Sequence, residues 1–416
     1  MKSENNISDY ENSDAFRFLN STGFFHPVDV PGDIRINRGN FKPSIAVLLL
    51  TTSCNFCCTY CYASAGTGKG NIMPLRTGYA AIDLVSNNAK NEGAEYFTLN
   101  FHGGGEPTQS WTSLCELVNY ARSKALPARI SISTNGYLSK EKLRWVLCNI
   151  DEISLSCDGT ADIQNLQRPL RSGGKTYDRV FETIKALDNN RKPFGIRLTV
   201  TESGTDSLPD SISFFCEETG CKSFQAEPAF DHGRAKKNGT ALINQKRFAR
   251  SFLDAYDVAV SHNRYLFYSG ARPEILTSNF CQAPFNALVV SSEGLLTTCY
   301  EVFDPAHELG DLFFIGSLNP DTGIKIIKSK HQLLLSRIEE RRKLCRGCFC
   351  YWHCAGDCPA KTISSSGDGH LYTGIRCNIN REITKELLLR YIYESGGIWM
   401  GNNAEQSSLK SALIIK

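Results

Sequence analysis

Residues 51–64 read TTSCNFCCTYCYAS and place Cys54, Cys58 and Cys61 within one short loop. Their spacing, C-x3-C-x2-C, lets three thiolates bind three irons of a 4Fe–4S cubane, which leaves the fourth iron without a protein ligand. An open iron is useful because a substrate or cofactor can chelate it. A structural zinc site is the alternative, but it requires four closed ligands, and no histidine lies nearby. Cys57 exceeds the pattern, and we interpret it as a small buried residue.

The cysteine content of the whole chain also indicates a metalloprotein. The sequence has 17 cysteines in 416 residues, and its polar start lacks the apolar stretch of a secretory signal. A secreted disulfide scaffold would be short and would carry such a signal, so clustered thiols indicate metal sites in a reducing cytosol. No run approaches the roughly 18 apolar residues that a membrane-spanning helix needs. We therefore expect a soluble, cytoplasmic protein without a membrane partner.

The charge balance argues against a nucleic-acid partner. The chain has 46 Lys and Arg against 43 Asp and Glu, which gives a formal net charge of +3. This balance does not favour a nucleic-acid surface or a polybasic membrane surface. Hydrophobic residues make up 41% and charged residues 21%, values near the globular average that exclude wholesale disorder.

From residue 45 onward, apolar runs alternate with segments of helical periodicity. The apolar, β-branched runs predict buried parallel strands at 45–52, 96–102, 129–134, 152–156, 194–201 and 222–227. The periodic segments predict helices at 77–92, 111–124, 140–149, 177–188, 208–219 and 245–262. Ser139 and Asp210 stand where helix-start residues are expected. Six consecutive strand–helix units predict an α/β fold with a parallel sheet, either an open partial barrel or a doubly wound sheet.

In both of these folds, the chemistry is expected at the carboxyl ends of the strands. Each predicted strand ends at a polar or cysteine-containing group. These groups are the cysteine loop at 54–61, HGGGEP at 102–107, STNG at 133–136, SCDG at 156–159, residues 199–202 and EP at 227–228. Because parallel strands bring their carboxyl ends to one edge, we expect these groups to converge on a single site.

The first two groups resemble signatures of the radical S-adenosylmethionine (SAM) enzymes. The three cysteines, with Tyr60 before the third, resemble the cysteine loop of that superfamily. Gly104, Gly105, Glu106 and Pro107 resemble its GGEP motif, which in the family holds the methionine amino group of SAM. Glycines allow close backbone approach, and a carboxylate suits an ammonium group. The alternative for Glu106 is a solvated loop charge.

The resemblance also implies further contacts to SAM. Ser133, Asn135 and Ser154 match positions where the family contacts the ribose and carboxylate of SAM, although Ser and Asn at strand ends are also ordinary caps. Arg168 is either a ligand of the SAM carboxylate or a member of a surface ion pair. In the superfamily, a reduced cluster cleaves SAM, and the resulting 5′-deoxyadenosyl radical abstracts hydrogen from an unactivated carbon.

A second set of cysteines lies in the C-terminal part of the chain. It follows the order Cys281, Gly294, Cys299 and then Cys345-x2-Cys348-x5-Cys354-x3-Cys358, with Cys377 after a further gap. A zinc ribbon or finger is one interpretation of such pairs. The full order, however, resembles the SPASM domain that follows many radical SAM cores.

That resemblance implies two auxiliary 4Fe–4S clusters, which makes three clusters in total. By position, the outer cluster would be bound by Cys345, Cys348, Cys354 and Cys377, and the inner cluster by Cys281, Cys299 and Cys358. Three ligands leave the inner cluster with an open iron. Sulfatase-maturing relatives carry a further cysteine about six residues after the first, and this chain has Ala287 there. Cys350 is surplus to the pattern.

Together these features imply a partial (β/α)6 TIM-like barrel with a C-terminal cysteine-rich iron–sulfur (SPASM) domain. We place an N-terminal extension at 1–44, the radical SAM core at 45–265, the SPASM domain at 266–380, and a C-terminal helix and tail at 381–416. Only about 44 residues precede the first strand, too few for the winged helix with which peptide-modifying relatives often grip a leader.

The implied function is modification of a ribosomally synthesised (RiPP) precursor peptide through a carbon–carbon, carbon–oxygen or thioether cross-link. The expected partners are that peptide and a flavodoxin- or ferredoxin-type electron donor. Asp158, Glu227 and His102 are candidate acid–base residues by location. The alternatives are a formylglycine-generating sulfatase maturase, a radical SAM small-molecule dehydrogenase and a non-enzymatic zinc adaptor.

Overall fold

The computed structural model describes residues 41–364 and 375–394, except residues 69 and 346, together with residues 16, 17 and 20. The chain divides into two compact units, one formed by Gly39–Ile383 and the other by Met1–Arg38 with Thr384–Lys416. All of the candidate site residues belong to the larger unit. Nearly all of the expected N-terminal extension and C-terminal tail lie outside the described residues.

Six parallel strands form the centre of the sheet. They are β1 (Ile45–Leu48), β2 (Phe97–Phe101), β3 (Ala128–Thr134), β4 (Glu152–Ser156), β5 (Phe194–Val200) and β6 (Ser223–Pro228). Each strand pairs in parallel with the next strand in the chain, so the order is sequential from β1 to β6. A doubly wound sheet would reverse its strand order at a switch point. The sequential order therefore confirms the partial barrel. The first strand is shorter than predicted, because residues 49–52 already lead into the cysteine loop.

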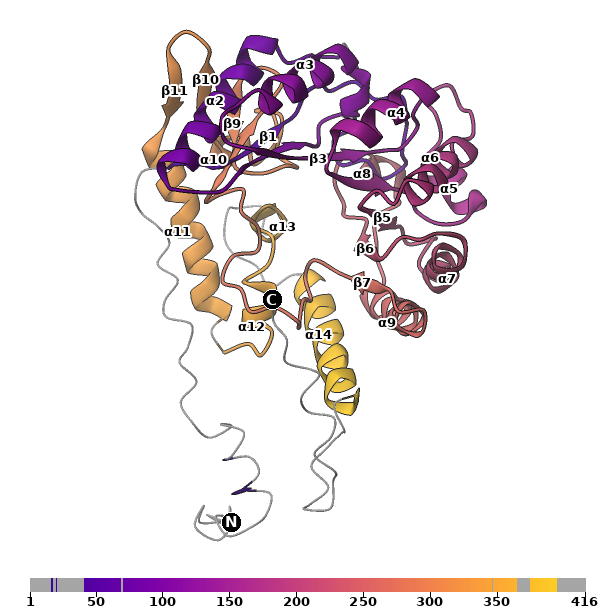
Figure 1. Cartoon of the computed structure of the whole chain (residues 1–416). Coiled ribbons are helices and arrows are strands. Elements are labelled where there is room, and N and C mark those ends of the chain that lie inside the picture. The colour runs from indigo at the N-terminus through magenta and orange to yellow at the C-terminus, as the bar shows by residue number, and fades with distance from the viewer. Residues whose placement is uncertain are drawn as a thin grey trace. The chain divides into compact units, whose positions relative to one another are not determined.

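One helix follows each of these strands, as the helical periodicity predicted (Figure 1). The helices are α2 (Leu75–Asn91), α3 (Trp111–Arg122), α4 (Lys140–Asn149), α6 (Tyr177–Asn189), α7 (Leu208–Glu218) and α9 (Gln245–Ser261). Ser139 caps α4, since its side chain accepts a hydrogen bond from the Lys142 N–H. Asp210 lies in the first turn of α7, while Ser207 is its N-cap residue. Within the described residues of the barrel, three short helices were not predicted, because they span too few turns to show a period: η2 (Pro107–Gln109), α5 (Ala161–Gln167) and α8 (Gly233–Asn238).

Two faces of the central strands differ in chemistry. In β5, Ile196, Leu198 and Val200 are buried, whereas the alternate residues Arg197 and Thr199 are half-buried. The same alternation in β2, β3 and β4 gives a row of half-buried polar side chains: Asn100, Ser131, Ser133, Ser154 and Ser156. Because side chains alternate between faces along a strand, one face packs apolar groups under the helices and the other is polar. The polar face is available to ligands.

Short strands extend the same sheet beyond both edges of the six-stranded centre. β7 (Tyr265–Phe267) pairs in parallel with β6, and β8 (Ala287–Val290) pairs in parallel with β1. Beyond β8, three antiparallel strands complete the sheet: β9 (Leu295–Thr297), β10 (Phe314–Asn319) and β11 (Gly323–Ile326). The segment after residue 266 thus shares one sheet with the barrel strands.

Six cysteines lie on or between the helices that follow the last strand: Cys345, Cys348, Cys350, Cys354, Cys358 and Cys377. These helices are α11 (Lys328–Cys345), α12 (Tyr351–Cys354), α13 (Pro359–Ser364) and α14 (Ile375–Glu394), of which the last is the helix expected near 380–394. Figure 1 shows α11 below β10 and β11, with α12 near its lower end. Within the described part of the chain, no helix is both long and apolar enough to cross a bilayer.

Candidate active site

The cysteine loop follows β1 directly and is held by arginines from distant segments. Arg234, in α8, donates from Nε to the Cys58 carbonyl at 2.8 Å and from its backbone N–H to the Cys61 carbonyl at 2.9 Å. Arg171 donates from Nη2 to the Ala65 carbonyl at 2.7 Å. These hydrogen bonds hold the backbone of the cysteine loop in place. The protein itself therefore helps to position the three thiols.

The surroundings of the loop fit an anionic group. Among the described residues, Arg168 Nε and Arg234 Nη2 are buried without a hydrogen-bond partner. Unpaired buried donors are costly unless a ligand accepts from them, and an iron–sulfur cluster with thiolate ligands is such an acceptor. No three His, Cys, Asp or Glu side chains in the described ranges are close enough to hold a single metal ion. The thiolates of a cubane bind different irons and therefore do not converge on a single metal ion.

The glycine-rich turn after β2 packs directly against this loop. The Gly105 N–H donates to the Thr51 carbonyl at 2.7 Å, and the Glu106 N–H donates to the Ser53 carbonyl at 2.9 Å. A Cβ atom on Gly105 would lie 2.0 Å from the Ser53 oxygen, which only glycine avoids. Gly104 adopts φ = 68°, a left-handed conformation that also favours glycine. The turn therefore holds the Glu106 carboxylate beside the cysteines.

Four donors fix the Glu106 carboxylate. Oε1 accepts from the Thr108 N–H at 3.2 Å, the Thr108 hydroxyl at 2.8 Å and the Thr134 hydroxyl at 2.7 Å. Among the residues that the structure describes, Oε2 accepts only from the Asn135 N–H, at 2.7 Å. Glu106 is 3% exposed, so it is not a solvated loop charge. Since a carboxylate offers about four lone-pair sites, Oε2 is the atom with capacity left for an ammonium group.

We expect Glu106→Gln to weaken SAM binding by about 10- to 100-fold. The change removes a charge-assisted hydrogen bond, worth about 1.5–3 kcal/mol. It also places an amide donor among the existing donors of Thr108, Thr134 and Asn135. Isothermal titration of the anaerobic, cluster-loaded protein with SAM measures the effect. Glu92→Gln is the control, since Glu92 is exposed and pairs with Lys42. An unchanged affinity in Glu106→Gln would exclude Glu106 from the SAM site.

A buried network anchors the residue before the third cysteine. The Tyr60 hydroxyl donates to Asp158 Oδ2 at 2.6 Å and accepts from Arg168 Nη1 at 2.5 Å. The Thr199 N–H donates to Asp158 Oδ1 at 3.0 Å. Arg168 is 7% exposed, which excludes the surface ion pair that the sequence allowed. Burial raises the pKa of Asp158, while Arg168 and these donors lower it. The structure thus uses Asp158 to hold the loop.

The other residues matched to SAM contacts lie next to this site. Asn135 Nδ2 donates to Asn55 Oδ1 in the cysteine loop at 2.8 Å. Ser133 and Ser154 are paired in register on the neighbouring strands β3 and β4, and both are half-buried on the polar face. Their contacts with SAM remain a prediction, and so does that of Arg168.

His102 and Glu227 occupy different surroundings. His102 lies after β2 with its ring centroid 5.1 Å from that of Tyr300, and its Nδ1 has no partner among the described residues. Burial lowers the pKa of His102 to about 4, so the imidazole is neutral near pH 7. Glu227 accepts from the Ser269 N–H and hydroxyl, both at 2.9 Å, and faces Arg376 at 4.0 Å. Their acid–base roles remain predictions.

The C-terminal cysteines form two groups in the structure. Burial raises the pKa of Cys358, and so does its proximity to Cys299 and Cys281. Cys299 and Cys358 also pack against the same apolar cluster. In the other group, burial raises the pKa values of Cys345, Cys354 and Cys377, and each of these thiols is also influenced by Cys348. The assignment of these thiols to two iron–sulfur clusters, which the SPASM resemblance implied, remains a prediction.

A polar pocket lies between the first cysteine loop and the group that contains Cys299. Its lining includes Tyr62, His232, Glu301 and His307. Glu301 forms an ion pair there with Lys361. The sequence reasoning missed both residues, although each lies two or three positions after a predicted ligand cysteine. It also missed Arg171, whose contact with the loop spans more than 100 residues.

Comparisons with known proteins show which families the chain resembles. Residues 48–212 match the model of the radical SAM superfamily. The sporulation killing factor maturation protein SkfB of Bacillus subtilis is 25% identical over 65% of this chain and 64% of its own length. A cysteine-type anaerobic sulfatase-maturating enzyme of Clostridium perfringens is 23% identical over 86% of this chain and 100% of its own. Fe-coproporphyrin III synthase of Methanosarcina barkeri is 25% identical, and the match spans only 58% of that protein.

Solved structures show the same fold. The enzyme anSMEcpe with bound AdoMet and Cp18Cys peptide superposes with a TM-score of 0.67 at 20% identity, over 84% of this chain and 98% of that one. Streptococcus suis SuiB bound to precursor peptide SuiA superposes with a TM-score of 0.52 at 14% identity, over 80% of this chain and 76% of that one. Residues 48–212 thus match a radical SAM domain that carries the GGEP turn and the cysteine loop, and the chain resembles SkfB and the anaerobic sulfatase-maturating enzymes in sequence and anSMEcpe in fold.

Proposed function

We propose that the protein modifies a ribosomally synthesised precursor peptide and installs a carbon–carbon, carbon–oxygen or thioether cross-link in it. The observation that carries this proposal is the closeness of two cysteine groups. Tyr62 directly follows Cys61, and its hydroxyl donates to the carbonyl of Tyr300, which directly follows Cys299, at 3.5 Å. A substrate in the pocket that Tyr62 lines would therefore lie next to both groups.

The chain's own residues would hold and orient the reactants. When bound, SAM and the first cluster would supply a 5′-deoxyadenosyl radical that abstracts hydrogen from an unactivated carbon. Glu106 would bind the methionine ammonium, and the serines of β3 and β4 would lie along the rest of SAM. The Glu301–Lys361 pair and His232 would contact the substrate and restrict the entry of water. These tasks are positioning and exclusion, which a radical reaction requires of its protein.

The two C-terminal cysteine groups support an oxidative outcome. We assign the outer 4Fe–4S cluster to Cys345, Cys348, Cys354 and Cys377, and the inner one to Cys281, Cys299 and Cys358. Together with the first cluster, the chain would bind three 4Fe–4S clusters. A flavodoxin- or ferredoxin-type protein would donate electrons to them. Redox centres near the substrate suit the loss of two hydrogens, which a cross-link requires.

Relatives support a peptide substrate in two ways. SkfB is named as a maturation protein, and SuiB has been solved with its precursor peptide. A second candidate function, formylglycine formation in a sulfatase, is favoured by the full-length match to sulfatase-maturating enzymes. Against it, the position of their additional cysteine is Ala287, which is 1% exposed within β8 and pairs with Ile45. The inner group then has three cysteines, and we rank the cross-link first.

Anaerobic co-expression with each short open reading frame beside the gene tests the function. We expect one peptide to lose two hydrogens, and fragment mass spectrometry to locate the loss in a short core motif. Cys299→Ala should retain SAM cleavage but form no product. An aldehyde at a single Ser or Cys would instead favour the sulfatase-maturase function. Unmodified peptides with an active, SAM-cleaving enzyme would refute a peptide substrate.

A further inference from the structure

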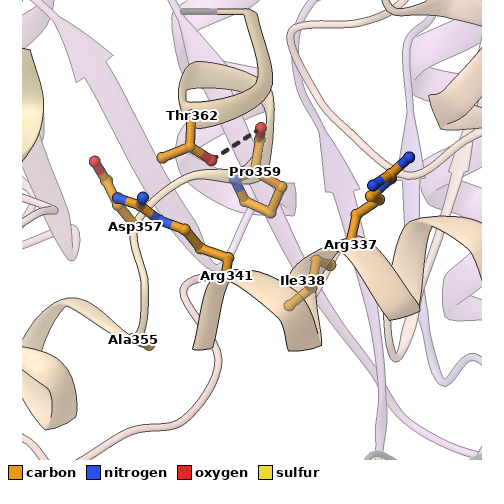
Figure 2. A pocket seen from close by; sticks show the side chains of 7 residues that line it. All are labelled: Arg337, Ile338, Arg341, Ala355, Asp357, Pro359 and Thr362. Atoms are coloured by element: carbon orange, nitrogen blue, oxygen red, sulfur yellow. Dashed lines mark hydrogen bonds between the residues drawn. The ribbon is translucent and has the colours of Figure 1, made fainter. Parts of the chain in front are cut away.

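A buried arginine donates a hydrogen bond directly to one of the outer cysteines. Arg341, on α11, is 3% exposed. Its Nη2 donates to the Cys377 sulfur at 3.0 Å, and its Nε donates to the Gly356 carbonyl at 3.0 Å. Figure 2 shows Arg341 in the wall of a pocket that also contains Asp357 and Pro359. The guanidinium thus joins α11, the loop before Cys358 and the cysteine at the start of α14.

The loop that receives Arg341 has an unusual backbone. Ala355, Gly356 and Asp357 all have positive φ, at 51°, 78° and 71°. Two of these residues carry a Cβ atom, for which this region is unfavourable, so the surrounding contacts must hold them there. The turn directs the Gly356 carbonyl to Arg341. The contact is therefore part of the folded structure around Cys354 and Cys358.

Arg341 differs from the other buried arginines near these cysteines. Arg342 donates to the Tyr351 hydroxyl at 2.9 Å and to Glu339 at 3.0 Å. Arg376 donates from Nε to both oxygens of Asp357, at 2.9 Å each. Arg342 and Arg376 thus bind carboxylates, whereas Arg341 donates to a sulfur that we assign as a cluster ligand. Its positive charge and its N–H both act on that sulfur.

We propose that Arg341 is a positioning residue that raises the reduction potential of the iron–sulfur cluster assigned to Cys345, Cys348, Cys354 and Cys377. This inference rests on the proposed function, which places the cluster there. Hydrogen bonds to ligand sulfurs and nearby charge are two of the factors that set such potentials. Reduction adds negative charge, so a cationic donor stabilises the reduced form more than the oxidised form.

The test is a redox titration of the full-length, anaerobically reconstituted protein, followed by electron paramagnetic resonance. Cys348→Ala identifies the outer signal, because it should remove that signal alone. We expect Arg341→Gln to shift the midpoint of this signal to a more negative potential, with the other signals unchanged. Arg341→Lys, which keeps the charge, should shift it less. Arg337→Gln is the matched control, since Arg337 lines the same pocket one turn earlier and pairs with Glu340.

The possible results distinguish the role of Arg341 from the assignment of the outer cluster, which belongs to the proposed function. An unchanged midpoint in Arg341→Gln overturns the role of Arg341. If Arg341→Gln does not assemble the cluster, Arg341→Lys decides: a negative shift supports the role, and an unchanged midpoint overturns it. A wild-type protein that binds the iron of only one cluster and shows no signal dependent on Cys348 would instead refute the outer-cluster assignment, whatever Arg341 does.

Discussion

Cys58→Ala should abolish the reductive cleavage of SAM, whereas Cys57→Ala should retain it. Cys58 is buried, and its carbonyl is held by Arg234. Cys57 is the cysteine that the motif does not require. Its backbone N–H donates to the Pro169 carbonyl at 2.8 Å, a bond that alanine preserves. The two substitutions are at adjacent positions, but only Cys58→Ala removes a cysteine that we assign as a cluster ligand.

The measurement is 5′-deoxyadenosine formed from SAM with dithionite as the reductant, together with the iron content of each variant. We expect product from Cys57→Ala at a rate close to wild type and none above background from Cys58→Ala. If the Cys58→Ala variant still cleaves SAM, Cys58 is not a ligand of the first cluster. Loss of cleavage in both variants, with both folded, would show that Cys57 is also needed.

The sequence alone was sufficient for the parts of the site that depend on local patterns. The strand and helix periods predicted the six units, because each element buries one face and repeats at a fixed interval. The loop and the GGEP turn were visible because their cysteines and glycines are close in sequence. Burial of Glu106 and Arg168 then removed the surface alternatives for both residues.

Contacts between distant segments could not be predicted in this way. Arg234 lies in α8, shortly after β6, yet it binds the carbonyl of Cys58, 176 residues away. The pairing of β8 with β1 joins the cysteine-rich segment to the barrel sheet, and no local pattern in a four-residue strand indicates its partner. The hydrogen bond from Arg341 to the Cys377 sulfur could not be predicted either, because it depends on how α11 and α14 pack.

Arg376→Met should destabilise the cysteine-rich region by about 3–5 kcal/mol, the usual cost of removing one partner of a buried ion pair. Arg376 is 7% exposed and binds both oxygens of Asp357. It also faces Glu227 at 4.0 Å and lies over the ring of Phe230, 4.8 Å from its centroid. Methionine fills much of the same volume, so the loss would come mainly from two buried carboxylates left without their cation.

Thermal and denaturant unfolding of the anaerobic protein, with iron content measured in parallel, would test this expectation. Arg381→Met is the matched control, because Arg381 is an exposed residue of the same helix that lies over the ring of Phe349. We expect the control to change stability by less than about 0.5 kcal/mol. A similarly small loss in Arg376→Met would show that the ion pair contributes little to folding.

A second substitution identifies the cause of the loss. Asp357→Asn combined with Arg376→Met removes one of the unpaired charges, while Asn can still accept the Cys358 N–H that Asp357 Oδ1 accepts at 2.7 Å. If unpaired charge is the cause, the double variant should be more stable than Arg376→Met alone. If lost packing is the cause, the two variants should unfold alike. Because Arg376 directly precedes Cys377 and also faces Glu227 at the end of β6, recovery in the double variant would show that charge pairing helps to connect the outer cysteines to the barrel.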